Sequence, residues 1–222
     1  MLLENVKSII NISFFISCLS AFVWLSGMAL FYSTKSSELS TSFYLRYSLA
    51  GVLAIGPAVY FMTASILRIN KEKRNIIIAN FAIMLILYIL SQNENWLITG
   101  ETTYFWGRYL LYGSLSYLII PAFSIMMIAS LAHLYFAFRR KKESAEKNQL
   151  RLLTISLFIA SFGSMDFIPC FGIEIYPAGY IFILAFIAIQ TYSIVNYGEV
   201  KSALIVQNTP NGVIIIDRNG FI

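Results

Sequence analysis

The sequence predicts an all-α polytopic membrane protein: a bundle of about six, or seven, transmembrane helices with a short C-terminal β segment. Of its 222 residues, 58% are apolar and 12% are charged, whereas soluble domains average about 45–50% and about 25%. No soluble fold of this size has a core that hides so much apolar surface. The apolar residues also form long blocks. Soluble enzymes, disordered chains and disulfide-stapled secreted domains are therefore excluded.

Six apolar segments are each predicted to cross the membrane, because each has at least the roughly 17 residues that span ~30 Å of hydrocarbon. They are Ile9–Tyr32, Phe43–Leu67, Asn75–Ser91, Phe105–Phe138, Leu150–Ile168 and Ala178–Asn196. The fourth has 34 residues and would reach about 51 Å as a straight helix. We therefore expect it to tilt, to project from the membrane, or to kink at Pro121.

The basic residues predict the orientation, since they accumulate on the cytoplasmic side of membrane proteins. Thirteen fall on one side: Lys7, Arg68, Lys71, Lys73, Arg74, Arg139, Arg140, Lys141, Lys142, Lys147, Arg151, Lys201 and Arg218. Only Lys35, Arg46 and Arg108 fall on the other. Both termini are then cytoplasmic, and the outer loops are Ser33–Ser42, Gln92–Tyr104 and Pro169–Pro177. Trp96 and Trp106 flank the second outer loop, where an interfacial aromatic belt is expected.

The C-terminal tail changes composition after Asn196. Tyr197, Val200 and Leu204 continue at helical spacing and predict a helical linker over residues 199–208. A break follows at Pro210 and Gly212. An aliphatic strand over 213–216 and an Asn-Gly turn then predict a β-hairpin.

This order of features resembles the opening of a PAS sensory domain, over about fifteen residues. The resemblance rests on Asn208-Thr209-Pro210-Asn211-Gly212-Val213, the aliphatics after it, Asp217, Gly220 and Phe221-Ile222. It implies that Asp217 and Gly220 shape the turn between the first two strands. Residues 209–222 would be the start of a truncated PAS domain.

Residues 1–198 are predicted to be a transmembrane sensor bundle, and they resemble the seven-helix N-terminal region of bacterial sensor histidine kinases. The residues that carry the resemblance are Arg151-Leu152-Leu153 after a basic loop, Asp166-Phe167-Ile168-Pro169, Tyr176-Pro177, and Tyr192-Ser193-Ile194-Val195-Asn196-Tyr197. The chain departs from that family in having six predicted spans and a cytoplasmic N-terminus. The resemblance implies a bacterial inner-membrane location and a homodimeric full-length protein.

Four polar residues are candidates for a ligand site in the outer half of the bundle: Arg46, Arg108, Asp166 and Glu174. An ionisable group at membrane depth is usually paired or functional. We expect Asp166 to pair with Arg46 or Arg108 beside an outward cavity, the alternative being that each snorkels to the interface. The glycines at 51, 56 and 163 either permit close helix packing or are ordinary membrane-helix glycines, and we favour the second interpretation.

No catalytic, metal or cofactor site is predicted. Cys18 and Cys170 are not expected to form a disulfide, and with His133 they make no Cys/His zinc site. His133 is interpreted as a helix-end residue at the headgroups, although a titrating switch is an alternative. The sequence therefore favours a sensory input module rather than an enzyme. Its predicted partners are the bilayer and a small-molecule or lipid ligand, without nucleic acid. A small multi-pass transporter or channel is the main alternative, and a lipid-modifying enzyme the second.

Overall fold

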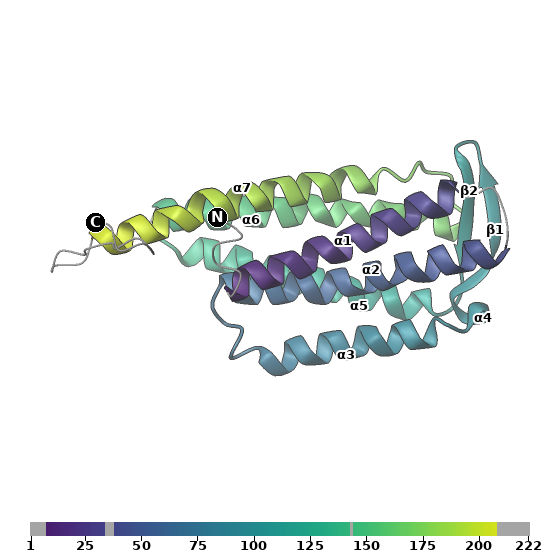
Figure 1. Ribbon diagram of the computed structural model, residues 1–222, viewed down its shortest axis with the longest axis horizontal. Helices are drawn as coiled ribbons and strands as arrows, with labels where there is room; N and C mark the ends of the chain where they lie inside the picture. Colours follow the sequence, from purple (N-terminus) through teal and green to yellow (C-terminus); the bar gives the residue numbers. More distant parts are fainter. Residues whose placement is uncertain (1–7, 34–37, 143, 208–222) are drawn as a thin grey trace, which may run out of the picture.

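The computed structural model describes residues 8–33, 38–142 and 144–207, and this described part is 79% helical. Its elements are α1 (Ile9–Ser33), α2 (Glu38–Ile66), α3 (Arg74–Leu90), α4 (Glu94–Leu97), β1 (Ile98–Tyr104), β2 (Gly107–Tyr112), α5 (Ser116–Arg140), α6 (Ser144–Ser161), the 3₁₀ helix η1 (Phe162–Phe171) and α7 (Gly179–Gln207). The long helices lie side by side along one axis, as Figure 1 shows. The β1–β2 hairpin covers one end of this bundle, and the described chain ends lie toward the other.

Within the described residues, four segments are long and apolar enough to cross a membrane: α1, Phe43–Ile66 of α2, α5, and the continuous Glu146–Phe171 run of α6 and η1. Helix α3 and the Gly179–Val195 part of α7 are apolar but shorter. The predicted class, a helical protein with several membrane-length apolar helices, is thus confirmed. Six membrane crossings stay a prediction.

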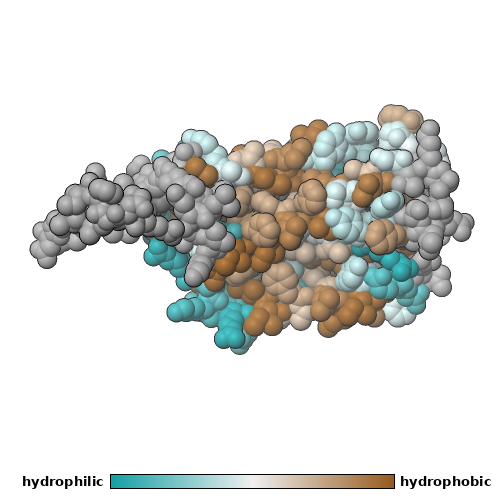
Figure 2. Space-filling view, in the orientation of Figure 1, coloured by the Kyte–Doolittle hydropathy of each residue, from teal (hydrophilic) through white to brown (hydrophobic). Residues whose placement is uncertain are grey.

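The surface of the bundle is apolar around its middle. Figure 2 shows hydrophobic residues gathered across the centre of one face, with hydrophilic residues toward both ends. Helix α3 alone exposes Ile78, Leu85 and Ile89, each more than half accessible. Monomeric soluble proteins rarely expose contiguous apolar patches on this scale. Such a band is typical of a protein whose middle is surrounded by lipid.

The fourth predicted span is wrong in its first third. Residues Gly107–Tyr112 form strand β2, which pairs antiparallel with β1 from Tyr104↔Gly107 to Ile98↔Tyr112. The predicted outer loop Gln92–Tyr104 is correspondingly α4 followed by β1. The short apolar run Tyr109–Tyr112 fits a buried strand as well as a helix, because periodicity does not separate the two over so few residues. The hairpin leaves α5 with 25 residues, so a kink at Pro121 is not needed to fit it across the membrane.

Helices α1 and α2 approach closely, against our interpretation of Gly51 as an ordinary glycine. A Cβ atom on Gly51 would lie 2.6 Å from the Ser20 carbonyl oxygen and overlap the Trp24 backbone. A Cβ atom on Gly27 would lie 2.7 Å from Cα of Ser48. The Ser48 hydroxyl also donates to the Trp24 carbonyl, at 3.2 Å. The two backbones meet here because small residues face each other on both helices.

Helices α6 and α7 are joined by a buried polar contact. Gln190 Nε2 donates to Ser156 Oγ at 2.8 Å, and both side chains are fully buried. Ser156 in turn donates to the Leu153 carbonyl. Around this contact lies the main apolar cluster of the bundle, with Leu153, Leu157 and Phe186 among its members. Helix α7 is therefore held on its α6 side.

Candidate functional site

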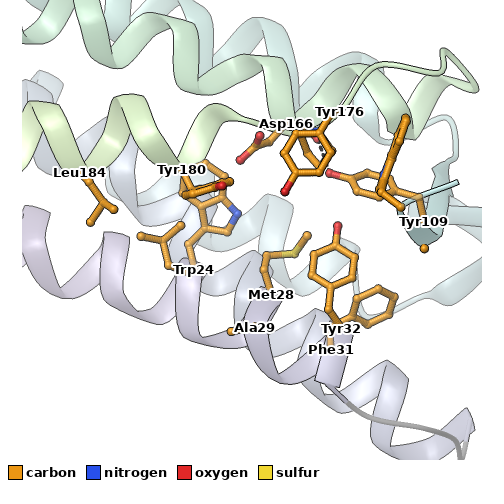
Figure 3. A pocket seen from close by; sticks show the side chains of 14 residues that line it. Trp24, Met28, Ala29, Phe31, Tyr32, Tyr109, Asp166, Tyr176, Tyr180 and Leu184 are labelled. Carbon is orange, nitrogen blue, oxygen red and sulfur yellow. Dashed lines mark hydrogen bonds between the residues drawn. The ribbon is translucent and has the colours of Figure 1, made fainter. Parts of the chain in front are cut away.

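A cavity of about 490 Å³ lies at the hairpin end of the bundle, between α1 and α7. Its volume falls within the range of about 300–1,000 Å³ typical of small-molecule sites. The residues that line it are Trp24, Leu25, Met28, Ala29, Phe31, Tyr32, Trp106, Gly107, Tyr109, Asp166, Tyr176, Pro177, Tyr180 and Leu184. Figure 3 shows how side chains from α1, β2, η1 and α7 converge on this space.

Helical spacing explains how α1 and α7 present their side chains. Trp24, Met28 and Tyr32 follow one another at intervals of four residues, which places them on one face of α1. Tyr180 and Leu184 repeat this spacing on the first turns of α7. In Figure 3 the α1 residues lie opposite those of η1 and α7. Both helices thus form walls of the cavity.

Asp166 is the acidic side chain of the cavity. It lies in η1, and its Oδ1 accepts a hydrogen bond of 2.5 Å from the backbone N–H of Gly179, the first residue of α7. A carboxylate at a helix N-terminus interacts favourably with the helix dipole. Position 179 has no space for a side chain, since a Cβ atom there would lie 2.6 Å from the Asp166 carboxylate. Glycine therefore allows η1 and α7 to meet at this bond.

Two tyrosine hydroxyls hold the hairpin on η1. Tyr109 donates to the Asp166 carbonyl at 2.7 Å, and Tyr104 donates to the Pro169 carbonyl at 2.9 Å. Burial raises the pKa of Tyr109 far above its ordinary value, with the neighbouring Tyr32 as a further cause. The Tyr109 hydroxyl thus stays a neutral donor at physiological pH. The hairpin forms a fixed wall of the cavity.

Aromatic contacts connect this wall to the loop before α7. The Trp106 ring stacks on Tyr104 with centroids 4.8 Å apart, and it meets Tyr176 edge-on at 5.9 Å. On the opposite side Trp24 stacks on Phe167 at 6.2 Å. These contacts constrain the orientation of the rings.

The predicted ligand residues have different positions. Asp166 lines the cavity, whereas Glu174 lies exposed on the loop between η1 and α7, outside the lining. Arg46 is half-buried on α2 and is not among the lining residues. Arg108 belongs to β2, but its side chain lies outside the described part of the structure. The pairing of Asp166 with Arg46 or Arg108 stays a prediction.

The predicted linker lies on α7, which continues as helix to Gln207. Tyr197, Val200 and Leu204 therefore belong to this helix, as their spacing predicted, although the positions of their side chains are not described. Pro210, Gly212, Asp217 and Gly220 lie outside the described residues. His133 lies on α5, with its ring 6.0 Å from that of Tyr60, and it does not line the cavity.

The lining is rich in aromatic rings and hydroxyl groups. Within residues 8–33, 38–142 and 144–207, no three His, Cys, Asp or Glu side chains gather as metal ligands would. The described lining offers aromatic faces, tyrosine hydroxyls, one carboxylate and an apolar end. Sequence reasoning missed the aromatic walls, because Trp24, Trp106 and Tyr180 come from distant segments. The available signal was the four-residue repeat Trp24–Met28–Tyr32, which aligns large side chains on one face of α1.

Compared with protein-family models, curated proteins and solved structures, the chain gives no match.

Proposed function

We propose that the chain is the membrane-embedded sensory input module of a bacterial signal-transduction protein of the sensor histidine kinase type. In this proposal a ligand occupies the cavity at the hairpin end and changes the position of α7. Helix α7 then passes the change to a cytoplasmic PAS domain that begins in residues 209–222. In this proposal the enzymatic activity belongs to a separate output module, such as a histidine kinase, and not to the input module.

One observation carries the proposal: α7 is at once a wall of the cavity and the helix that leads away from it. Tyr180 and Leu184 line the cavity on its first turns, and the same helix continues to Gln207 at the opposite end of the bundle (Figure 1). A ligand that contacts Tyr180 therefore contacts the element that ends at the predicted linker. Ligands shift a protein between states through such differential contacts.

The charge distribution supports an orientation with the cavity outside. Most of the basic residues lie in two connections: the loop between α2 and α3, and the segment that joins the C-terminal end of α5 to the beginning of α6. Figure 1 places both connections at the end of the bundle opposite the hairpin. Basic loops favour the cytoplasmic side. In this orientation six helices cross an inner membrane, both termini are cytoplasmic, and the hairpin faces outward.

Filling the cavity tests the proposal without a known ligand. Ala29→Trp places a large ring in the lining, and spin labels at Arg140→Cys and Lys201→Cys report the distance between the ends of α5 and α7. The background carries alanine at Cys18 and Cys170. We expect a shift of about 2 Å, the scale of helix movements in switching proteins. Ala79→Trp, on an exposed part of α3, should leave the distance unchanged. A folded Ala29→Trp protein with an unshifted distance would contradict the proposal.

A small transporter or channel is favoured by a different observation. Gln190 is fully buried within α7. Among the described residues, its Oε1 accepts no hydrogen bond, and the Oγ of Ser193 has no hydrogen-bond partner. Transporters place polar groups at such interior positions. Reconstituted vesicles separate the two functions: proton or potassium flux above that of empty vesicles, abolished by Gln190→Leu, would support a transporter.

A further inference from the structure

The carboxylate of the cavity has no described cationic neighbour in the lining. None of the 14 lining residues that the structure describes is lysine, arginine or histidine, and Asp166 is the only acid among these 14. The amide of Gly179 supplies a hydrogen bond to it, at 2.5 Å, but not a full charge. An ionisable group within a membrane protein is usually balanced by an opposite charge. The described lining thus holds one carboxylate and no cationic side chain to balance it.

Aromatic rings surround the same space. Six of the lining residues are tryptophans or tyrosines: Trp24, Tyr32, Trp106, Tyr109, Tyr176 and Tyr180. In Figure 3 the Asp166 carboxylate, the Tyr32 and Tyr176 hydroxyls and the Trp24 indole face a common centre. Tryptophan and tyrosine faces attract organic cations, and quaternary ammonium groups are bound by rings arranged in this way.

The cavity also has an apolar part, which in Figure 3 includes Leu184, away from Asp166. Leu25 and Ala29 of α1 line the same cavity, and the Leu184 side chain is 55% exposed. An alkyl chain extending past Leu184 would thus enter the region that lipid covers. The two ends of the cavity differ in polarity as do the two ends of an amphiphile.

From this arrangement we infer that the cavity binds an amphipathic organic cation, with its ammonium group between Asp166 and the aromatic rings and its alkyl chain leaving beside Leu184. The inference rests on the proposed function in taking this cavity as the input site. It also differs from the predicted pairing of Asp166 with Arg46 or Arg108, because the ligand, rather than an arginine of the chain, supplies the positive charge.

Tryptophan fluorescence of the purified chain in a neutral maltoside detergent tests the inference. Two of the three tryptophans, Trp24 and Trp106, line the cavity. We expect decyltrimethylammonium to change the emission saturably. Tetramethylammonium, which lacks the chain, should bind more weakly. Decyl sulfate, with the same chain and the opposite charge, should give no saturable change.

Variants assign the effect to the residues. Asp166→Asn retains the oxygen that accepts from Gly179, so it should keep the fold, and it should weaken decyltrimethylammonium binding about tenfold or more. Glu174→Gln, at an exposed acid outside the lining, should have no effect. Tyr180→Leu should weaken binding severalfold, whereas Tyr192→Leu, exposed elsewhere on α7, should not. Circular dichroism and thermal unfolding confirm that each variant is folded.

Three outcomes would overturn the inference: equal binding of decyl sulfate, unaltered affinity in folded Asp166→Asn, or cation binding that appears only after Arg46→Gln or Arg108→Gln. The last would show that an arginine of the chain already neutralises Asp166. These outcomes are distinct from failure of the proposed function. Cation binding without any change in the distance from α5 to α7 would contradict signalling while leaving the ligand class intact.

Discussion

Helix α1 has two different sides. Toward α2 it is packed backbone to backbone, with Gly27 against Ser48 and Gly51 against Trp24 and Ser20. Toward α7, at the hairpin end, it faces a cavity of about 490 Å³. Interiors are normally close-packed, and large voids are few. The difference shows that α1 packs directly on α2, while α7 packs on α6 and η1 and is separated from α1 by the cavity at the hairpin end.

The largest expected effect comes from breaking the tight side. Gly51→Ala would bring a methyl group against the Ser20 carbonyl and the Trp24 backbone, and overpacking of this kind costs about 1–3 kcal/mol of unfolding free energy. Reversible unfolding in mixed micelles measures the loss. Gly100→Ala, where a Cβ atom meets nothing within 4 Å, is the matched control. Equal destabilisation of the two variants would mean that the α1–α2 approach is not close.

The next largest effect is expected at the hydrogen bond that joins α7 to α6. Ser156→Ala removes the acceptor of Gln190 Nε2 and leaves a buried donor unpaired, which costs about 1–3 kcal/mol. Adding Gln190→Leu should restore part of the lost unfolding free energy, because the Nε2 donor left unpaired by Ser156→Ala is then absent. A double-mutant cycle measures this coupling. Additive losses would indicate that the hydrogen bond contributes nothing to holding α7.

Alkaline pH should weaken the fixed hairpin wall. Burial raises the pKa of Tyr109 in the folded chain, whereas an unfolded tyrosine titrates near pH 10. The stability that this difference contributes is fully present below about pH 10 and is lost as pH rises toward the folded pKa. Between pH 10 and 11 the loss is about 1 kcal/mol. The free energy of unfolding, measured across this pH range, should fall less steeply for Tyr109→Phe than for the wild type. Identical slopes in the two proteins would indicate that the Tyr109 hydroxyl is solvated.

The smallest effect is expected at the second hydroxyl that holds the hairpin. Tyr104→Phe removes the 2.9 Å bond to the Pro169 carbonyl, at a cost of about 0.5–1.5 kcal/mol. Hydrogen exchange of the β1 and β2 amides should increase more than that of α1. Tyr117→Phe, at a 73% exposed position on α5, serves as the control. Unchanged exchange in Tyr104→Phe would show that the hairpin is held by its ring contacts instead.

The sequence was sufficient to predict the helices because long apolar blocks have few alternatives in a membrane protein. It failed at the hairpin, where only Gly113-Ser114 separates Tyr109–Tyr112 from the following apolar block. The signals there were β-branched Thr99, Thr102 and Thr103 and a glycine at 107, which has φ +138°. A strand reading of that stretch would have shortened the fourth span to the observed α5.

The candidate site was predictable only at Asp166, since a lone acid near a span end is conspicuous by its cost. Its partners were not predictable, because hydropathy does not tell which faces of distant helices meet. Aromatic residues such as Trp106 also fit an interfacial belt. In the structure Trp106 lies against Tyr104 and Tyr176 at the cavity, and its place in an interfacial belt stays a prediction. The glycines at 27 and 51 gave no sign of their neighbours for the same reason.

Because α7 is long, a small tilt at one end of the helix would produce a large displacement at the other. Its 29 residues span about 43 Å at about 1.5 Å per residue. If the helix pivots near Gly179, a tilt of about 5° moves the end at Gln207 by about 4 Å, by the same helix geometry. That displacement exceeds the roughly 1–2 Å helix shifts that commonly accompany switching. An angular change too small to disturb the packing around the pivot is therefore amplified into a translation at the far end.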